Sequence, residues 1–146
     1  MLNEVLTYEL TAINQYYVHA KMCAHWGYAR LAEKKREESL EEMRHADKII
    51  SRILYLEGVP NLQRLGSVQL GEDVPEQHRL DLELERDAVM RLNRAVALCR
   101  DKGDNGSREL LMEMLTSEEE SVDWLETQLS VIKDIGVERY LAEQLH

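Results

Sequence analysis

The sequence predicts an all-α fold in which four long helices form a bundle and a short fifth helix follows at the C-terminus. Residues that favour helices, namely Leu, Ala, Glu, Arg and Met, are abundant. The chain has only two prolines and seven glycines, and most of them fall in two short stretches. Outside those stretches, apolar residues recur every three or four positions, which is the period of an amphipathic helix.

The first half of the chain is predicted to form a helical hairpin. Residues 2–25 form its first helix, because apolar side chains recur there at steps of three and four residues. Gly27 separates this helix from a second one over residues 28–57. The second helix is polar in its first half and apolar in its second half, at positions such as Ile49 and Ile53.

Residues 58–73 are predicted to form a long crossover connection. Gly58 followed by Pro60 is a typical helix stop. The apolar residues of the stretch are Leu62, Leu65, Val68 and Leu70. We expect these side chains to anchor the connection along the protein.

The second half is predicted to form another hairpin and a short terminal helix. Pro75 lies in the first turn of a helix over residues 74–102, and a turn sequence follows it. Ser107 is the expected N-cap of a helix over residues 107–134, and the fifth helix covers residues 137–144. Short, long and short connections between four long helices predict a bundle with one crossover.

The composition limits the partners and the location of the protein. Its 146 residues suit one domain, residues 1–146, with a substantial core. The net charge of −10 argues against binding to nucleic acid or an anionic membrane and is compatible with attracting cations. No apolar run could span a membrane, and the N-terminus lacks a signal-peptide pattern. Cys23 and Cys99 are interpreted as reduced thiols of a cytoplasmic protein, and a disulfide between them is the disfavoured alternative.

Four glutamates, one on each long predicted helix, repeat with equal spacing in both halves of the chain. They are Glu9 and Glu42 in the first half and Glu85 and Glu118 in the second, 33 residues apart in each pair. Three positions after the second glutamate stands His45 in the first half and Ser121 in the second, on the same helix face. All four glutamates keep phase with apolar residues, which predicts that they point into the bundle.

This register predicts a metal centre. Buried carboxylates are unfavourable unless they are paired or bind a metal. A glutamate from each of two helices plus Glu-x-x-His from the other two is the di-iron pattern of helix bundles. The alternative is coincidence in a chain with 28 acidic residues, and Glu41, Glu119 and Glu120 are interpreted as solvated side chains of that kind. The match of four helices to one register favours the metal centre.

Met43 stands between Glu42 and His45 in sequence but faces another direction, about 100° from Glu42 around the helix. An apolar stripe follows that direction. Its residues are Leu40, Met43, Ile50 and Leu54, with Leu10 and Tyr17 on the first helix. A second apolar face on a bundle helix predicts contact with another subunit.

With these residues in place, the chain resembles the bacterioferritins over nearly its whole length. The matching motifs are Glu-Leu-Thr-Ala-Ile-Asn-Gln-Tyr at 9–16, Glu-Glu-Met-Arg-His-Ala-Asp at 41–47, the run into the crossover at 53–63 and Asp-Trp-Leu-Glu-Thr at 123–127. The resemblance implies a ferritin-like four-helix bundle that assembles from two-fold dimers into a shell of 24 subunits. It implies iron storage and detoxification. A ferroxidase activity would oxidise Fe(II) at an intrasubunit di-iron centre, and the shell would store Fe(III) mineral until a reductase or ferredoxin drives its release.

The resemblance also assigns roles to the residues of the centre. Glu9 and His45 match terminal ligands of one iron. Glu42 and Glu118 match the bridging ligands, and Glu85 matches a terminal ligand of the second iron.

Two further residues match positions of the family. Tyr16 resembles a hydrogen-bond partner of the centre, and ordinary core packing is the alternative. Met43 matches the axial ligand of a b-type haem, which two copies of this methionine from two-fold related subunits hold between them. The alternative for Met43 is a residue that fills a gap in the subunit interface.

Ser121 departs from the family pattern, which has a second histidine at this position. A hydroxyl is a poorer ligand for Fe(II) than imidazole, and Glu120 points about 100° away from the required face. We therefore expect a weakened second iron position and impaired oxidation. Some bacterioferritins combine two subunit types, so the alternative function is a haem-carrying structural subunit of a mixed shell, whose second subunit type oxidises the iron.

Four histidines lie outside this register. They are His19, His25, His78 and His146. We expect them at the surface or at helix ends, without a role in the centre.

Overall fold

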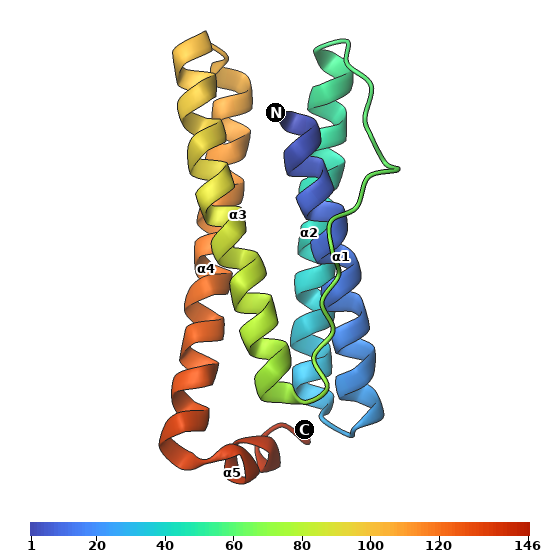
Figure 1. Ribbon diagram of the computed structural model, residues 1–146, viewed down its shortest axis with the longest axis vertical. Helices are drawn as coiled ribbons and strands as arrows, with labels where there is room; N and C mark the ends of the chain where they lie inside the picture. The colour runs from blue at the N-terminus through green and yellow to red at the C-terminus, as the bar shows by residue number, and fades with distance from the viewer.

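The protein is built from five helices without any strand, and the computed structural model describes residues 1–146 (Figure 1). The helices are α1 (Leu2–His25), α2 (Ala29–Tyr55), α3 (Val74–Lys102), α4 (Asn105–Ile135) and α5 (Val137–Ala142). α1 and α2 form one antiparallel hairpin, α3 and α4 form the other, and α5 lies at the end of the bundle away from the N-terminus (Figure 1). The predicted all-α bundle with one crossover and a short fifth helix is confirmed. None of the helices combines the length and the apolarity that a membrane crossing requires.

Aspartate side chains begin both helices of the second hairpin. Asp73 caps α3 by accepting a hydrogen bond from the Glu76 N–H at 2.9 Å. Asp104 caps α4 by accepting from the Ser107 N–H at 3.1 Å. The prediction that Ser107 is the N-cap is therefore wrong. Ser107 lies inside the first turn of α4, where its buried hydroxyl accepts a hydrogen bond from Arg52.

α2 ends at Tyr55, two residues before the predicted end, and the other helix boundaries also lie within two residues of the predicted ones. Glu57 takes the left-handed conformation that turns the chain, with φ of 64°. The Gly58 N–H then donates to the Ile53 carbonyl at 2.9 Å, as in many helix C-termini. A glutamate thus occupies a conformation that usually selects glycine.

The apolar core is divided along the bundle. The largest apolar cluster fills the end where the chain begins and takes residues from all four long helices, among them Leu6, Ile49, Leu92 and Leu111. Another cluster, which includes Cys23 and Tyr140, lies at the α5 end. Between the two ends, polar and charged side chains face the interior. This middle section positions the candidate site.

The crossover runs beside α1 (Figure 1) and is held there by polar contacts. The backbone N–H groups of Gly66, Gln69 and Gly71 donate to Thr11 Oγ1, Gln15 Oε1 and His19 Nε2 at 2.8, 3.1 and 3.0 Å. The three acceptors are four residues apart, so they form one row along α1. The crossover therefore follows a helix face that presents one acceptor per turn.

The apolar residues of the crossover do not anchor it. Leu62, Leu65 and Leu70 are about half exposed, at 58%, 51% and 47%. The prediction of apolar anchors is therefore wrong for the three leucines, and only Val68 is partly buried, although the crossover does lie along the protein. The backbone of the crossover faces α1 for hydrogen bonding, which leaves these side chains directed to the outside.

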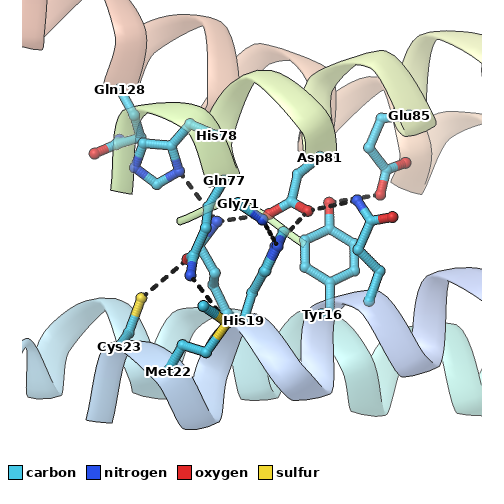
Figure 2. A network of polar contacts seen from close by, with 12 residues as sticks. Tyr16, His19, Met22, Cys23, Gly71, Gln77, His78, Asp81, Glu85 and Gln128 are labelled. Atoms are coloured by element: carbon cyan, nitrogen blue, oxygen red, sulfur yellow. Dashed lines mark hydrogen bonds and ion pairs between the residues drawn. The ribbon is translucent and has the colours of Figure 1, made fainter. Parts of the chain in front are cut away.

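A buried ion pair joins α2 to α3 near the end of the crossover. Lys35 Nζ donates to Asp81 Oδ2 at 2.6 Å, and both side chains are fully buried. Gln15 Nε2 donates to Asp81 Oδ1 at 2.9 Å. His19 Nε2 accepts from the Gly71 N–H, so Nδ1 carries the ring proton and donates to Asp81 Oδ1 at 2.9 Å (Figure 2). Burial acts to raise the pKa of Asp81, but Lys35 and His19 hold it well below its usual range.

His78 extends this network to α5. Lys35 Nζ donates to His78 Nδ1 at 3.1 Å, so Nε2 carries the ring proton and donates to the Tyr140 hydroxyl at 3.0 Å. Tyr140 donates in turn to Gln128 Oε1 at 2.7 Å. Burial and the charge of Lys35 lower the pKa of His78 well below its usual range. A continuous polar chain thus connects the short fifth helix to the interior of the bundle.

The network corrects the prediction for two histidines. His19 and His78, expected at the surface or at helix ends, are fully buried, whereas His25 and His146 are exposed as expected. The expectation was wrong because both rings have charged partners inside the bundle. Lys35 stands in a run of charged residues, a pattern that is typical of a solvated face.

Candidate metal centre

Five predicted ligands from four helices converge in the middle of the bundle. They are Glu9 on α1, Glu42 and His45 on α2, Glu85 on α3 and Glu118 on α4, and all five are buried. Each keeps phase with the apolar residues of its own helix, so the packing that buries those residues also turns the ligands inward.

Four of these residues form one compact group. Glu9, Glu42, His45 and Glu118 each contribute an atom, and these atoms lie within 4.8 Å of one another. His45 Nδ1 is 3.7 Å from Glu9 Oε2, 3.6 Å from Glu42 Oε2 and 3.2 Å from Glu118 Oε1. None of these four atoms has a hydrogen-bond partner of good geometry. Buried polar atoms without partners are rare and unfavourable. The group therefore fits a cation with three oxygen ligands and one nitrogen ligand.

The protonation of the group also depends on burial. Burial raises the pKa of Glu9 and of Glu118 to about 7. Burial and the neighbouring carboxylates raise the pKa values of Glu42 and Glu85 well above the usual range. Burial acts to lower the pKa of His45, but the carboxylates around it raise it to about 12. Without a metal, protons therefore balance the clustered carboxylates, and a cation must displace them.

Two buried tyrosines contact Glu85. Tyr16 donates to Glu85 Oε1 at 2.7 Å (Figure 2). Tyr8 donates to Glu85 Oε2 at 3.1 Å and lies 3.4 Å from Glu118 Oε2. Sequence reasoning missed Tyr8. Its position eight residues before Tyr16, on the same helix face, is the signal that could have identified it.

Comparison with known proteins identifies the family of the chain. Residues 1–135 match the family model of the ferritin-like domain. The bacterioferritin of Mycobacterium leprae is 48% identical over 143 residues, which cover 98% of this chain and 90% of that relative. The chain belongs to the bacterioferritins. The bacterioferritins of Brucella melitensis and Streptomyces coelicolor are both 47% identical, over 95% and 97% of this chain and 86% and 84% of theirs.

In this bacterioferritin, Ser121 lies beside the centre without joining the compact group. Its side chain is buried, and its hydroxyl oxygen lies 2.9 Å from Glu38 Oε2 and 3.3 Å from the Ser117 carbonyl. Glu38, Glu42 and Glu85 form a second group whose oxygen atoms also lie within 4.8 Å of one another. Sequence reasoning missed Glu38, although its position four residues before Glu42 places both on one helix face.

Three other glutamates surround the centre at a distance from the compact group. Glu119 and Glu120 are exposed, as expected for solvated side chains. Glu41 is partly exposed, but its Oε1 lies 3.4 Å from His45 Nε2. Glu41 can therefore orient the ring through the nitrogen that faces away from the compact group.

Met43 lies on another face of this bacterioferritin. Its side chain is 51% exposed, and Leu40, Leu54 and Tyr17 are exposed with it. Four residues of the predicted apolar face are therefore exposed on the single chain, whereas Leu10 and Ile50 are partly buried and pack against the core.

Proposed function

We propose that this bacterioferritin stores and detoxifies iron by oxidising Fe(II) at the centre formed by the four glutamates and His45. The observation that carries this proposal is the set of buried atoms without hydrogen-bond partners on Glu9, Glu42, His45 and Glu118. A cation would satisfy all of them at once. Membership of the bacterioferritins supports the same function.

Fe(II) is the substrate in the proposed reaction. Glu9 and His45 are the proposed terminal ligands at the first position. Glu42 and Glu118 are the proposed bridging ligands, and Glu85 is the proposed terminal ligand at the second position. Each Fe(II) loses one electron, which dioxygen or peroxide accepts, and the resulting Fe(III) is stored as mineral.

The tyrosines have a positioning role in this proposal. Tyr16 and Tyr8 donate to different oxygens of Glu85, so together they fix the plane of its carboxylate. Burial, and then the charge of Glu85, raise the pKa values of both hydroxyls well above the usual range. Both tyrosines therefore stay protonated and act as hydrogen-bond donors.

The direct test measures Fe(II) oxidation in air by the purified protein. We expect Glu42→Ala to abolish the stoichiometric phase of oxidation, because Glu42 belongs to both carboxylate groups. Glu33→Ala, an exposed position on the same helix, is the matched control and should oxidise iron like the wild type. Equal rates in wild type and Glu42→Ala would show that the centre is not catalytic.

We further propose that the shell has 24 subunits and carries b-type haem at its two-fold interfaces. Met43 is the proposed axial ligand, one from each of two subunits. The residues present fit this group, because an exposed thioether stands among exposed apolar side chains on α2. When bound, haem would supply one-electron transfer. Met43 would hold its iron, and Leu40 and Leu54 would supply apolar surface.

Ser121 favours a second candidate function. A subunit without the second imidazole can serve as the haem-carrying structural subunit of a mixed shell, beside a second subunit type that oxidises iron. Ser121→His should then greatly raise the rate of Fe(II) oxidation by shells of this subunit alone. An unchanged rate in that variant would argue against the mixed-shell function.

The proposed location and partners rest on the family and on the net charge of the chain. We propose a cytoplasmic protein whose partners are iron, copies of itself and a reductase or ferredoxin that drives iron release. The net charge of −10 disfavours nucleic acids and anionic membranes as partners.

A further inference from the structure

Glu38 reaches from α2 toward α4, at the place where the family pattern has a histidine. Its side chain is only 12% exposed. The Ser121 hydroxyl on α4 donates to Glu38 Oε2 at 2.9 Å. The residue that replaces the imidazole thus holds a carboxylate beside the centre.

The Glu38 carboxylate belongs to a second group of possible ligands, whose atoms lie as close together as those of Glu9, Glu42, His45 and Glu118. One oxygen each of Glu38, Glu42 and Glu85 lies within 4.8 Å of the others. Glu85 is fully buried, and Glu42 is 1% exposed. The Glu42 oxygen without a hydrogen-bond partner, Oε2, also lies 3.6 Å from His45 Nδ1 in the first group. Glu42 is common to both groups, so the two candidate positions adjoin each other.

We propose that Glu38 replaces the missing histidine as a ligand, so that Glu38, Glu42 and Glu85 bind a second divalent cation, with Ser121 positioning Glu38. This inference rests on the proposed function, since it assumes a cation at the adjoining position. Helix geometry supports it, because Glu38 and Glu42 are one turn apart on α2 and present both carboxylates to α3 and α4.

The two positions then differ in chemistry. The first has an imidazole nitrogen among its ligands, which suits Fe(II), Co(II) and Zn(II). The second has only oxygen ligands, which suit harder cations such as Mn(II) and Mg(II) better. The second position therefore binds Fe(II) more weakly than the first but remains a defined site.

An opening between α2 and α4 leads to this second position. Its volume is about 520 Å³, and Glu37, Glu38, Glu41, Glu120 and Ser121 are among the residues that line it. The excess of carboxylates favours the entry of cations. Lys34 Nζ lies 3.1 Å from Glu38 Oε1 at the same opening, so a cation competes with this ammonium group for Glu38.

The test counts Co(II) ions bound to the assembled, chelator-stripped protein, because Co(II) binds without being oxidised by air. Equilibrium dialysis of the wild type should give two bound ions per chain, the second with lower affinity than the first. Glu38→Gln should lose one of them, and Glu37→Gln, which removes the same charge from the same opening, should keep both. Two ions in Glu38→Gln, or one in the wild type, would overturn the inference while leaving the first position intact. No ion in the wild type would contradict the proposed function as well.

Two Ser121 variants separate ligation from positioning. Ser121→Ala should keep two ions but weaken the second binding step by roughly tenfold, as for other residues that orient a metal ligand. Ser121→His combined with Glu38→Gln should restore two ions, because the imidazole takes over from the carboxylate. If Ser121→Ala loses the second ion and Glu38→Gln keeps it, the serine is the ligand and the inference is wrong.

Discussion

In the proposed second position, the serine at position 121 gives the neighbouring Glu38 the role of a metal ligand. Glu42 faces both carboxylate groups, and Ser121 leaves room for Glu38 to approach from the other side. Imidazole is the larger side chain and would occupy part of that space. In the proposed arrangement, Glu38 therefore takes the place of the imidazole that the family pattern has at position 121.

Protons should compete with cations at the first position. Glu9 and Glu118 have pKa values near 7, so below pH 7 each loses its ionised form about tenfold per pH unit. We expect Co(II) affinity to fall at least about tenfold from pH 7 to pH 6. Calorimetric titration at both pH values, in buffers of different ionisation enthalpy, measures the affinity and the protons released. An affinity independent of pH would exclude these carboxylates as ligands.

The same pKa values affect the stability of the metal-free protein. Folding raises the pKa values of Glu9 and Glu118 from 4.5 to about 7. Between pH 4.5 and pH 7, the folded chain therefore holds more protons than the unfolded chain. Their contribution to the unfolding free energy therefore falls as pH rises through this window. Thermal unfolding of chelated protein should show a lower Tm at pH 7.5 than at pH 6.5, because the opposing contribution of His78, whose pKa is lowered, lies mostly below this range. Co(II) should raise the Tm more at pH 7.5. A Tm that rises over this range would contradict the assignment.

At the scale of single elements, the helices were predictable because helical periodicity is a local property of the sequence. Their ends were less so. Ser107 is an acceptable N-cap by type, but α4 begins earlier, at Asn105. Asp104 is its N-cap and accepts a hydrogen bond from the Ser107 N–H. Gly58 was the expected turning residue, whereas Glu57 adopts the positive φ.

Glu57 offers a test of backbone strain at the end of α2. A left-handed conformation costs a residue other than glycine roughly 1–2 kcal/mol, and part of this is offset because glycine loses more entropy on folding. Glu57→Gly should therefore raise the stability by about 0.5–1 kcal/mol, measured as a higher Tm at equal protein concentration. Glu57→Ala removes the same charge without relieving the strain, so a gain in that variant would refute the explanation.

The ion pair between α2 and α3 should contribute strongly to stability. Asp81→Asn leaves Lys35 charged and buried without its carboxylate, which typically costs about 3–5 kcal/mol. Asp87→Asn removes an exposed carboxylate from the same helix and should cost under about 1 kcal/mol. Denaturant unfolding compares the two. Lys35→Met combined with Asp81→Asn should be more stable than Asp81→Asn alone, and the opposite order would contradict this account.

The sequence did not predict this ion pair, although it predicted the carboxylates of the centre. The glutamates form two pairs with equal spacing, so the two halves of the chain carry the same pattern. Lys35 and Asp81 occur once each, and their pairing depends on how α2 faces α3. The sequence of a single helix does not show which residues of α2 face α3. The burial of His19 and His78 depends on the same pairing of Lys35 with Asp81.

At the scale of the whole molecule, the apolar face around Met43 was predictable. A helix in a bundle needs only one apolar face for the core, so a second apolar stripe on α2 indicates a surface outside the core. The structure leaves this second face exposed on α2 and α1. The exposed leucines of the crossover extend the apolar surface of the single chain, and they were not expected there. Their outward direction follows from contacts of the crossover backbone with α1.

Haem binding offers the test of this face. Met43→Leu should abolish haem binding and leave Fe(II) oxidation unchanged, because the methionine points away from the carboxylates. Met90→Leu changes another exposed methionine, on α3, and should keep one haem per two chains. Absorption spectra of the assembled proteins provide the count. Full haem content in Met43→Leu would exclude this residue as the axial ligand.

The hydrogen bonds of the crossover require particular side chains on α1 but few particular side chains in the crossover itself. Its donors are backbone N–H groups, so Thr11, Gln15 and His19 on α1 fix its path whatever most of its own side chains are. Gly71 is an exception, because a Cβ there would collide with the backbone of Gln77. The outward leucines are therefore free to diverge between related proteins without moving the chain. Through them, the outer surface of the chain can change independently of the candidate metal centre.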